Sequence, residues 1–232
     1  MLKLIKLELK HINLRVYSIT TLILVGIILA FTYFVANAAQ VTQETEFMDY
    51  SNIFQFTCII SILLFSVLSA TMYINLIIKE YSGKRLSLLF SYPADRKKIF
   101  MAKVLIIFFL ISISMMMCTI IPIVIFSITE SFVPIVSDTI TAKLLFSTFE
   151  TIFVSVLFAN IIGIFAMGIG FIKKSVTVTL ISAFILFGVY GNIAIITSNP
   201  LISSLCVAGI SLFITVIVLI ILSNKVNQME VD

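Results

Sequence analysis

The chain of 232 residues is 61% hydrophobic and only 11% charged, with a mean hydropathy of +1.22 and a formal net charge of +4. Soluble domains carry about 25% charged residues, so this composition excludes a water-soluble core and predicts an all-α, polytopic membrane protein. At about 20 residues per membrane-spanning helix, the length fits one membrane domain over residues 1–232. It leaves no room for a separate nucleotide-binding domain.

Residues 1–15 predict an amphipathic helix that lies in the membrane surface. Apolar side chains recur there at spacings of three and four, at Leu2, Ile5, Leu9 and Ile12. A basic amphipathic helix suits the anionic headgroup layer, and the plainer alternative is a basic flank that only sets orientation. His11 is the single histidine of the chain, so it has no second histidine with which to bind a metal ion.

Six apolar segments follow and predict six transmembrane helices. They are residues 17–37, 53–78, 99–127, 143–170, 176–196 and 201–222. Pro122 removes a backbone hydrogen bond within the third segment, so we expect a kink there. In the fourth segment small residues recur along the helix and predict close packing. They are Ser155, Ala159, Gly163, Ala166 and Gly170.

Lysine and arginine are distributed unevenly between the two sides of this topology. Six spans place both termini on one side, together with fourteen of the fifteen Lys and Arg residues, and only Lys143 lies on the other. The positive-inside rule then places both termini in the cytoplasm, as in a multi-pass protein of the plasma membrane. The net positive charge is therefore a signal of topology, and no nucleic-acid partner is expected.

The longest polar interruption of the chain is the stretch 79–103, which carries seven basic residues and includes the predicted loop 79–98. Leu88 and Leu89 in its middle predict a short amphipathic helix at the membrane surface, with one face available to a partner. Pro93 disfavours helical geometry at the residue before it. We therefore expect this short helix to end there and the third span to begin shortly after.

The sequence lacks the motifs of the main enzyme classes. It has no phosphate-binding G-x-x-x-x-G-K-[ST] loop and no H-E-x-x-H pair. Its three cysteines, Cys58, Cys118 and Cys206, stand apart within apolar runs, which is typical of core residues. We expect no enzyme activity, no metal site and no cofactor bound by the chain itself.

One acidic residue, Glu150, lies inside a predicted span. It follows Lys143 by seven residues, about 10 Å along a helix. An ionised carboxylate in hydrocarbon costs a few kcal/mol, so Glu150 should face a polar cavity, be protonated or form an ion pair. One hypothesis places it on a substrate pathway, in contact with a cationic substrate. The alternative is a position near the outer interface, where it pairs locally or reaches water.

The stretch 83–103 has the pattern G-x-x-L-x-L-L-x-S-x-P-x-x-R-x-x-I-x-x-x-K, and in this it resembles the permeases of ABC-2-type ATP-driven exporters. Six spans, cytoplasmic termini and a basic interface helix before the first span are similar as well. In this family a cytoplasmic coupling helix between spans 2 and 3 docks on a separately encoded ATPase. The chain departs from the family in lacking Thr-Leu-Glu after Gly83, and its connection between the last two spans is too short for re-entrant helices.

The resemblance implies roles for residues of the loop. The ATPase-coupling residues would be Glu80, Gly83, Leu88, Leu89, Ser91, Pro93 and Arg96. Leu88 and Leu89 would form the apolar contact with the ATPase, and Gly83 would permit a tight exit from span 2. Arg96 would anchor the start of span 3.

The resemblance further implies a permease subunit that exports its substrate by alternating access, with ATP and Mg²⁺ bound by the partner ATPase. The expected partners are an ABC ATPase, a second copy or a homologous permease, and membrane lipid. Small permeases of this shape resemble those that export amphipathic antimicrobial or toxic peptides or confer immunity to them. Two alternatives stay open: a non-transporting membrane subunit for docking or sensing, and an ion-coupled carrier.

Overall fold

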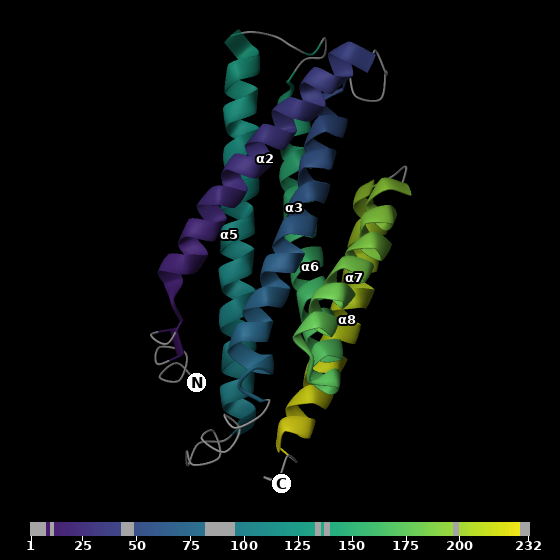
Figure 1. The fold of residues 1–232 in the computed structure, drawn as a ribbon. Coiled ribbons are helices and arrows are strands. Elements are labelled where there is room, and N and C mark those ends of the chain that lie inside the picture. The colour runs from purple at the N-terminus through teal and green to yellow at the C-terminus, as the bar shows by residue number, and fades with distance from the viewer. Residues whose placement is uncertain are drawn as a thin grey trace.

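The computed structural model describes residues 8–9, 12–42, 49–81, 96–132, 136, 140–196 and 200–227. All regular secondary structure in these ranges is helical (Figure 1). The elements are α2 (Leu14–Thr42), α3 (Tyr50–Tyr73), the π-helix η2 (Ile74–Ile78), α5 (Arg96–Phe132), α6 (Ala142–Lys173), α7 (Val176–Ile196) and α8 (Pro200–Asn227). This confirms the predicted all-α, polytopic class.

Within the described residues five helical segments are long and apolar enough to cross a membrane. They are Arg15–Ala38, Tyr50–Ile78, Lys97–Phe132, Ala142–Lys173 and Val207–Val226. In α7 the apolar segment with described side chains, Val176–Tyr190, is shorter. The whole of α7 has 21 residues and is about 31 Å long, close to the thickness of the hydrocarbon core.

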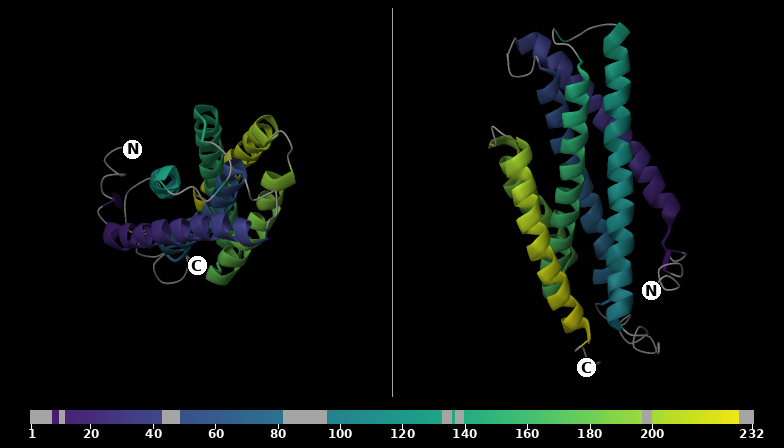
Figure 2. Two further views of the ribbon diagram at one scale, coloured as in Figure 1. Left: turned by 90° about the horizontal axis from the view of Figure 1, so that it is seen from above. Right: turned by 180° about the vertical axis from the view of Figure 1, so that it is seen from behind.

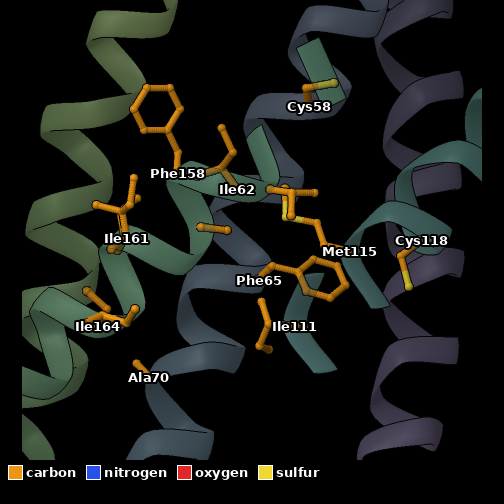
Figure 3. Packing of buried hydrophobic residues seen from close by; sticks show 14 of the residues in the cluster. Cys58, Ile62, Phe65, Ala70, Ile111, Met115, Cys118, Phe158, Ile161 and Ile164 are labelled. Atoms are coloured by element: carbon orange, nitrogen blue, oxygen red, sulfur yellow. The ribbon is translucent and has the colours of Figure 1, made fainter. Parts of the chain in front are cut away.

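The helices pack as a central pair with a pair on either side. α3 and α6 form the centre, α2 and α5 lie along one side of them, and α7 and α8 lie along the other (Figures 1 and 2). α6 is the most buried of the five membrane-spanning segments named above, and it contacts α3, α5, α7 and α8. Figure 3 shows this core, where Phe65 of α3 lies beside Ile111 and Met115 of α5.

The small residues of α6 permit this close packing. Ser69 Oγ of α3 occupies the place that a Cβ on Gly163 would take, and Thr179 of α7 does the same at Gly170. Ser155, too, is buried. The expected role of these small residues in helix packing is therefore confirmed. It explains why α3 and α7 both lie against α6.

Two further expectations concern Pro122 and the cysteines. α5 has 37 residues, runs beyond the expected segment 99–127 at both ends and continues through Pro122 as one helix. The two side views show no sharp bend in α5, in contrast to the kink expected at Pro122 (Figures 1 and 2). Cys58 and Cys118 are free, buried and well separated, as expected of core residues (Figure 3). The side chain of Cys206 lies outside the described residues.

Candidate functional site at the basic end of the helices

One end of the helices carries most of the described basic side chains, and we call it the basic end. It includes Lys79, Lys97, Lys98, Lys103, Lys173, Lys174 and Lys225. The chain leaves α3 here, passes through residues 82–95, which lie outside the described residues, and returns as α5 (Figure 1). The described residues on both sides of that stretch form the candidate site.

The last turn of the helix that leads into this stretch is a π-helix. Lys79 N donates to Ile74 O at 3.0 Å, five residues back, and Tyr81 N donates to Ile77 O at 3.0 Å. Single π-turns within longer helices are rare and are frequently found at functional sites. Here the π-turn directly precedes Glu80 and Tyr81, and so it sets the directions in which these two side chains leave the helix.

Lys103, in the second turn of α5, is buried and connects three segments of the chain. Its side chain is only 4% exposed, and Nζ forms an ion pair and a hydrogen bond with Glu80 Oε2. Nζ also lies 3.6 Å from Glu8 Oε2 in the N-terminal segment and donates to Leu76 O of η2 at 3.3 Å. A lysine that is removed from water requires such partners, because an isolated buried charge is strongly unfavourable.

We name Glu8, Glu80 and Lys103 the charge cluster. Its members come from the N-terminal segment, from the exit of α3 and from the start of α5, so it joins both sides of residues 82–95 to the segment that precedes α2. The carboxylates of Glu80 and Glu8 keep 29% and 22% exposure. Water therefore reaches the two carboxylates, while the ammonium group is enclosed.

An aromatic cluster lies at the same end. The ring centroids of Tyr81, Phe100 and Phe171 are 5.6 to 6.2 Å apart, at distances typical of favourable aromatic pairs. All three residues are buried. Because Tyr81 precedes residues 82–95, Phe100 follows them and Phe171 belongs to α6, this cluster anchors both ends of the predicted loop to the central helix.

The predicted coupling residues divide into two groups. Glu80 lies in the charge cluster, and Arg96 is the first residue of α5, with its side chain outside the described residues. The others, Gly83, Leu88, Leu89, Ser91 and Pro93, lie outside the described residues altogether. The predicted interface helix 1–15 is likewise described only in part, with Glu8 and Leu9 in helical geometry.

Glu150 lies at the opposite end from the charge cluster. The rings of Phe158 and Tyr190 are 5.4 Å apart, and Gly170 packs on Thr179. These two contacts align α6 and α7 antiparallel, so that Glu150 is level with the connection between α7 and α8. Its side chain is partly exposed. Glu150 follows the first residue of the membrane-spanning segment Ala142–Lys173 by eight residues, about 12 Å along the helix.

A second acidic residue at that end is more deeply buried. Glu130, near the end of α5, is 4% exposed. Its Oε1 accepts hydrogen bonds from Tyr50 OH at 3.0 Å and from Val136 N at 2.6 Å. Glu130 therefore ties the start of α3 to the segment after α5, and the sequence offered no way to distinguish it from a solvated loop residue.

An open, largely apolar groove of about 380 Å³ runs between α2, α3 and α7. Its lining includes Ile23 and Leu24 of α2, Leu64 and Leu68 of α3, and Phe184 of α7. Ile23 and Phe184 are 53% and 52% exposed. The groove is therefore a surface feature, formed where three helices meet without filling the space between them.

These features define an α-helical, membrane-embedded protein with one large, anchored basic connection between its second and third long helices. The profile of the family described as ABC-2 family transporter protein matches residues 4–189, which is most of the chain. The chain therefore belongs to the ABC-2 transporter family and is a permease subunit, the transmembrane component rather than the ATPase. No curated protein and no solved structure matches the chain. Membership implies an ABC ATPase as partner.

Glu8, Tyr81 and Phe100 had no predicted role, and Lys103 was only the last residue of the motif 83–103, without a role of its own. A signal for Lys103 exists, because it is a lone lysine between Ala102 and Val104 in an apolar helix, where an ionisable side chain needs a partner. That partner, Glu80, is 23 residues away along the chain. No local spacing rule connects residues so far apart.

Proposed function

We propose that this chain is the membrane subunit of an ATP-driven exporter of the plasma membrane, with its basic end and both termini in the cytoplasm. Residues 79–98 contact the partner ATPase, which binds ATP and Mg²⁺ and performs the hydrolysis. The observation that carries this proposal is the anchoring of both ends of that stretch to the helical core. The charge cluster and the aromatic cluster supply that anchoring.

The anchoring matters because a force applied to a loop moves the helices only if the loop is fixed to them. Packed helices have few alternative arrangements and shift as units. When the ATPase displaces residues 82–95, Glu80 and Lys103 transmit that displacement to the end of α3 and the start of α5. Glu8 carries it to the segment before α2, so three helices respond together.

The groove between α2, α3 and α7 is the surface on which we place the second permease copy and the substrate pathway. Its lining is apolar, and apolar walls suit an amphipathic or hydrophobic substrate. We propose an antimicrobial or toxic peptide as that substrate. Glu150, level with the connection between α7 and α8, then lies at the outer mouth of the pathway, where it attracts cationic groups.

The test measures ATP hydrolysis and substrate efflux by the chain co-expressed with an ABC ATPase from the same source. Leu88→Arg combined with Leu89→Arg places two charges on the proposed contact and should abolish stimulation of the ATPase by the permease. Phe132→Arg is the matched control, because Phe132 is an exposed apolar residue at the opposite end of α5. Unchanged hydrolysis and efflux in the double variant would refute the assignment of this contact.

Two other functions give different results in the same experiment. A subunit for docking or sensing binds the ATPase but supports no ATP-dependent efflux. An ion-coupled carrier transports under a proton gradient without any ATPase.

A further inference from the structure

A second cavity, of about 210 Å³, lies between α2, α3 and α5. Four of its lining residues carry hydroxyl groups: Tyr17, Ser18 and Thr21 of α2, and Ser114 of α5. Most of the remaining lining is apolar, and it includes Leu68, which also lines the groove between α2, α3 and α7. The two hollows are therefore neighbours on either side of one leucine.

The cavity and the groove differ in polarity and in their distance from the basic end. Along α2 the cavity is lined by residues 17–21 and the groove by residues 20–24, so the cavity lies nearer to the basic end. Hydroxyl groups thus gather toward the basic end, and apolar side chains follow toward the middle of the helices. A phospholipid in the leaflet at the basic end has the same order, with its glycerol esters toward the surface and its chains toward the bilayer centre.

Arg15 supplies a charge close to the cavity. It lies one helical turn before Ser18 on the same face of α2, and its side chain is exposed. Cys118 Sγ donates to Thr21 O at 3.5 Å, which gives the register of α2 and α5 where the two helices cross (Figure 1). Arg15 is also the first residue of the membrane-spanning segment Arg15–Ala38. A guanidinium group at the edge of an apolar segment is stabilised by an anion or by access to the interface.

We propose that this cavity binds an anionic glycerophospholipid of the leaflet at the basic end. The Arg15 guanidinium pairs with the phosphate, for which its planar fork is well suited. The hydroxyl groups of Ser18 and Ser114 bind the glycerol ester region, and the ring of Tyr17 forms part of the cavity wall. The first part of an acyl chain lies over Leu68 toward the groove.

The size of the cavity favours a lipid over a peptide or a drug-sized molecule. Sites for whole small ligands usually measure about 300–1,000 Å³, and this cavity is smaller. It holds the glycerol ester region of a lipid, whose chains then extend into the bilayer and need no enclosed space.

The absence of tryptophan from the chain permits a direct test. Tyr17→Trp places a fluorophore in the cavity with little change in size. Ile113→Trp is the matched control, because Ile113 is level with Tyr17 in the register above and is 62% exposed. Each variant is reconstituted in zwitterionic lipid that contains a small fraction of anionic lipid with brominated acyl chains, which quench tryptophan on contact.

A single arginine beside an anionic lipid corresponds to about fivefold enrichment of that lipid at the site. Tyr17→Trp should therefore be quenched far more than Ile113→Trp at the same lipid composition. Adding Arg15→Gln to Tyr17→Trp should remove this excess quenching. When the brominated lipid is zwitterionic, Tyr17→Trp should show no more quenching than Ile113→Trp. Equal quenching of the two tryptophans would overturn the site, and an excess that survives Arg15→Gln would overturn the role of the phosphate.

This test uses neither the ATPase nor transport. A failure of the lipid site is therefore distinguishable from a failure of the proposed exporter function, since the inference rests only on the chain being embedded in a membrane.

Discussion

Replacing Lys103 by methionine should destabilise the protein, because Lys103 is the only cation in the charge cluster. The side chain of methionine fills similar space but leaves the carboxylates of Glu80 and Glu8 without their ammonium partner. Breaking a buried ion pair by removing one member costs about 3–5 kcal/mol. Glu80 and Glu8 keep 29% and 22% exposure, so they partly rehydrate. We therefore expect a loss near the lower limit, about 3 kcal/mol.

For a chain of this length, about 3 kcal/mol corresponds to a decrease in Tm of about 6–12 °C. The assay is thermal unfolding of the purified protein in detergent, followed by size-exclusion chromatography of the remaining folded fraction. Lys173→Met is the matched control, because Lys173 is an exposed lysine at the same end and should shift Tm little. A Tm for Lys103→Met within the range of that control would refute the buried cluster.

A triple variant separates stability from coupling. Lys103→Met with Glu80→Gln and Glu8→Gln removes all three charges, and replacing a whole buried charge group is often neutral for stability. We expect its Tm to recover most of the loss. Its ATP-dependent efflux should stay low, because the ion pairs of the charge cluster then no longer join the exit of α3 and the start of α5 to the N-terminal segment. Full efflux by this variant would show that the charge cluster serves stability alone.

Three further predictions concern other parts of the chain. Gly163→Ala should lower the free energy of unfolding by about 1–3 kcal/mol, because the added methyl group overpacks against Ser69. Gly26→Ala is the control and should leave stability unchanged, because a Cβ at Gly26 meets open space. An equal Tm for both variants would contradict the close approach. In a background without native cysteines, Ile23→Cys at the groove should form cross-links between permease copies, whereas Ile113→Cys on α5 should not. The reverse pattern would place the second copy on α5. Glu150→Gln should lower export of a cationic peptide at unchanged abundance in the membrane, and full export by this variant would remove Glu150 from the pathway.

Helix existence and membrane embedding are properties that the sequence determines locally. Long apolar runs such as 53–78 can satisfy their backbone groups in lipid only as helices. The small residues around Gly163 indicate close packing for an equally local reason, because a missing side chain permits close approach whatever the neighbour is. The exact ends of α5 were less predictable, since polar residues such as Thr129 can continue a helix beyond the apolar segment.

The partners across the helices were decided only by tertiary structure. Gly163 indicates that some helix approaches, but only the packing shows that it is α3, through Ser69. Glu150 lies inside a span, as expected, and only the contacts of α6 with α7 place it level with the connection between α7 and α8.

For function, the sequence by itself determined the class of protein, because composition and a motif within one continuous stretch depend only on residues close along the chain. The charge cluster and the hydroxyl-lined cavity were decided by the fold. Each unites side chains from segments that are far apart in sequence, and short-range patterns carry no information about which distant surfaces meet. Glu80 was assigned to the coupling residues from the family resemblance, and only the packed helices gave it Lys103 as its partner.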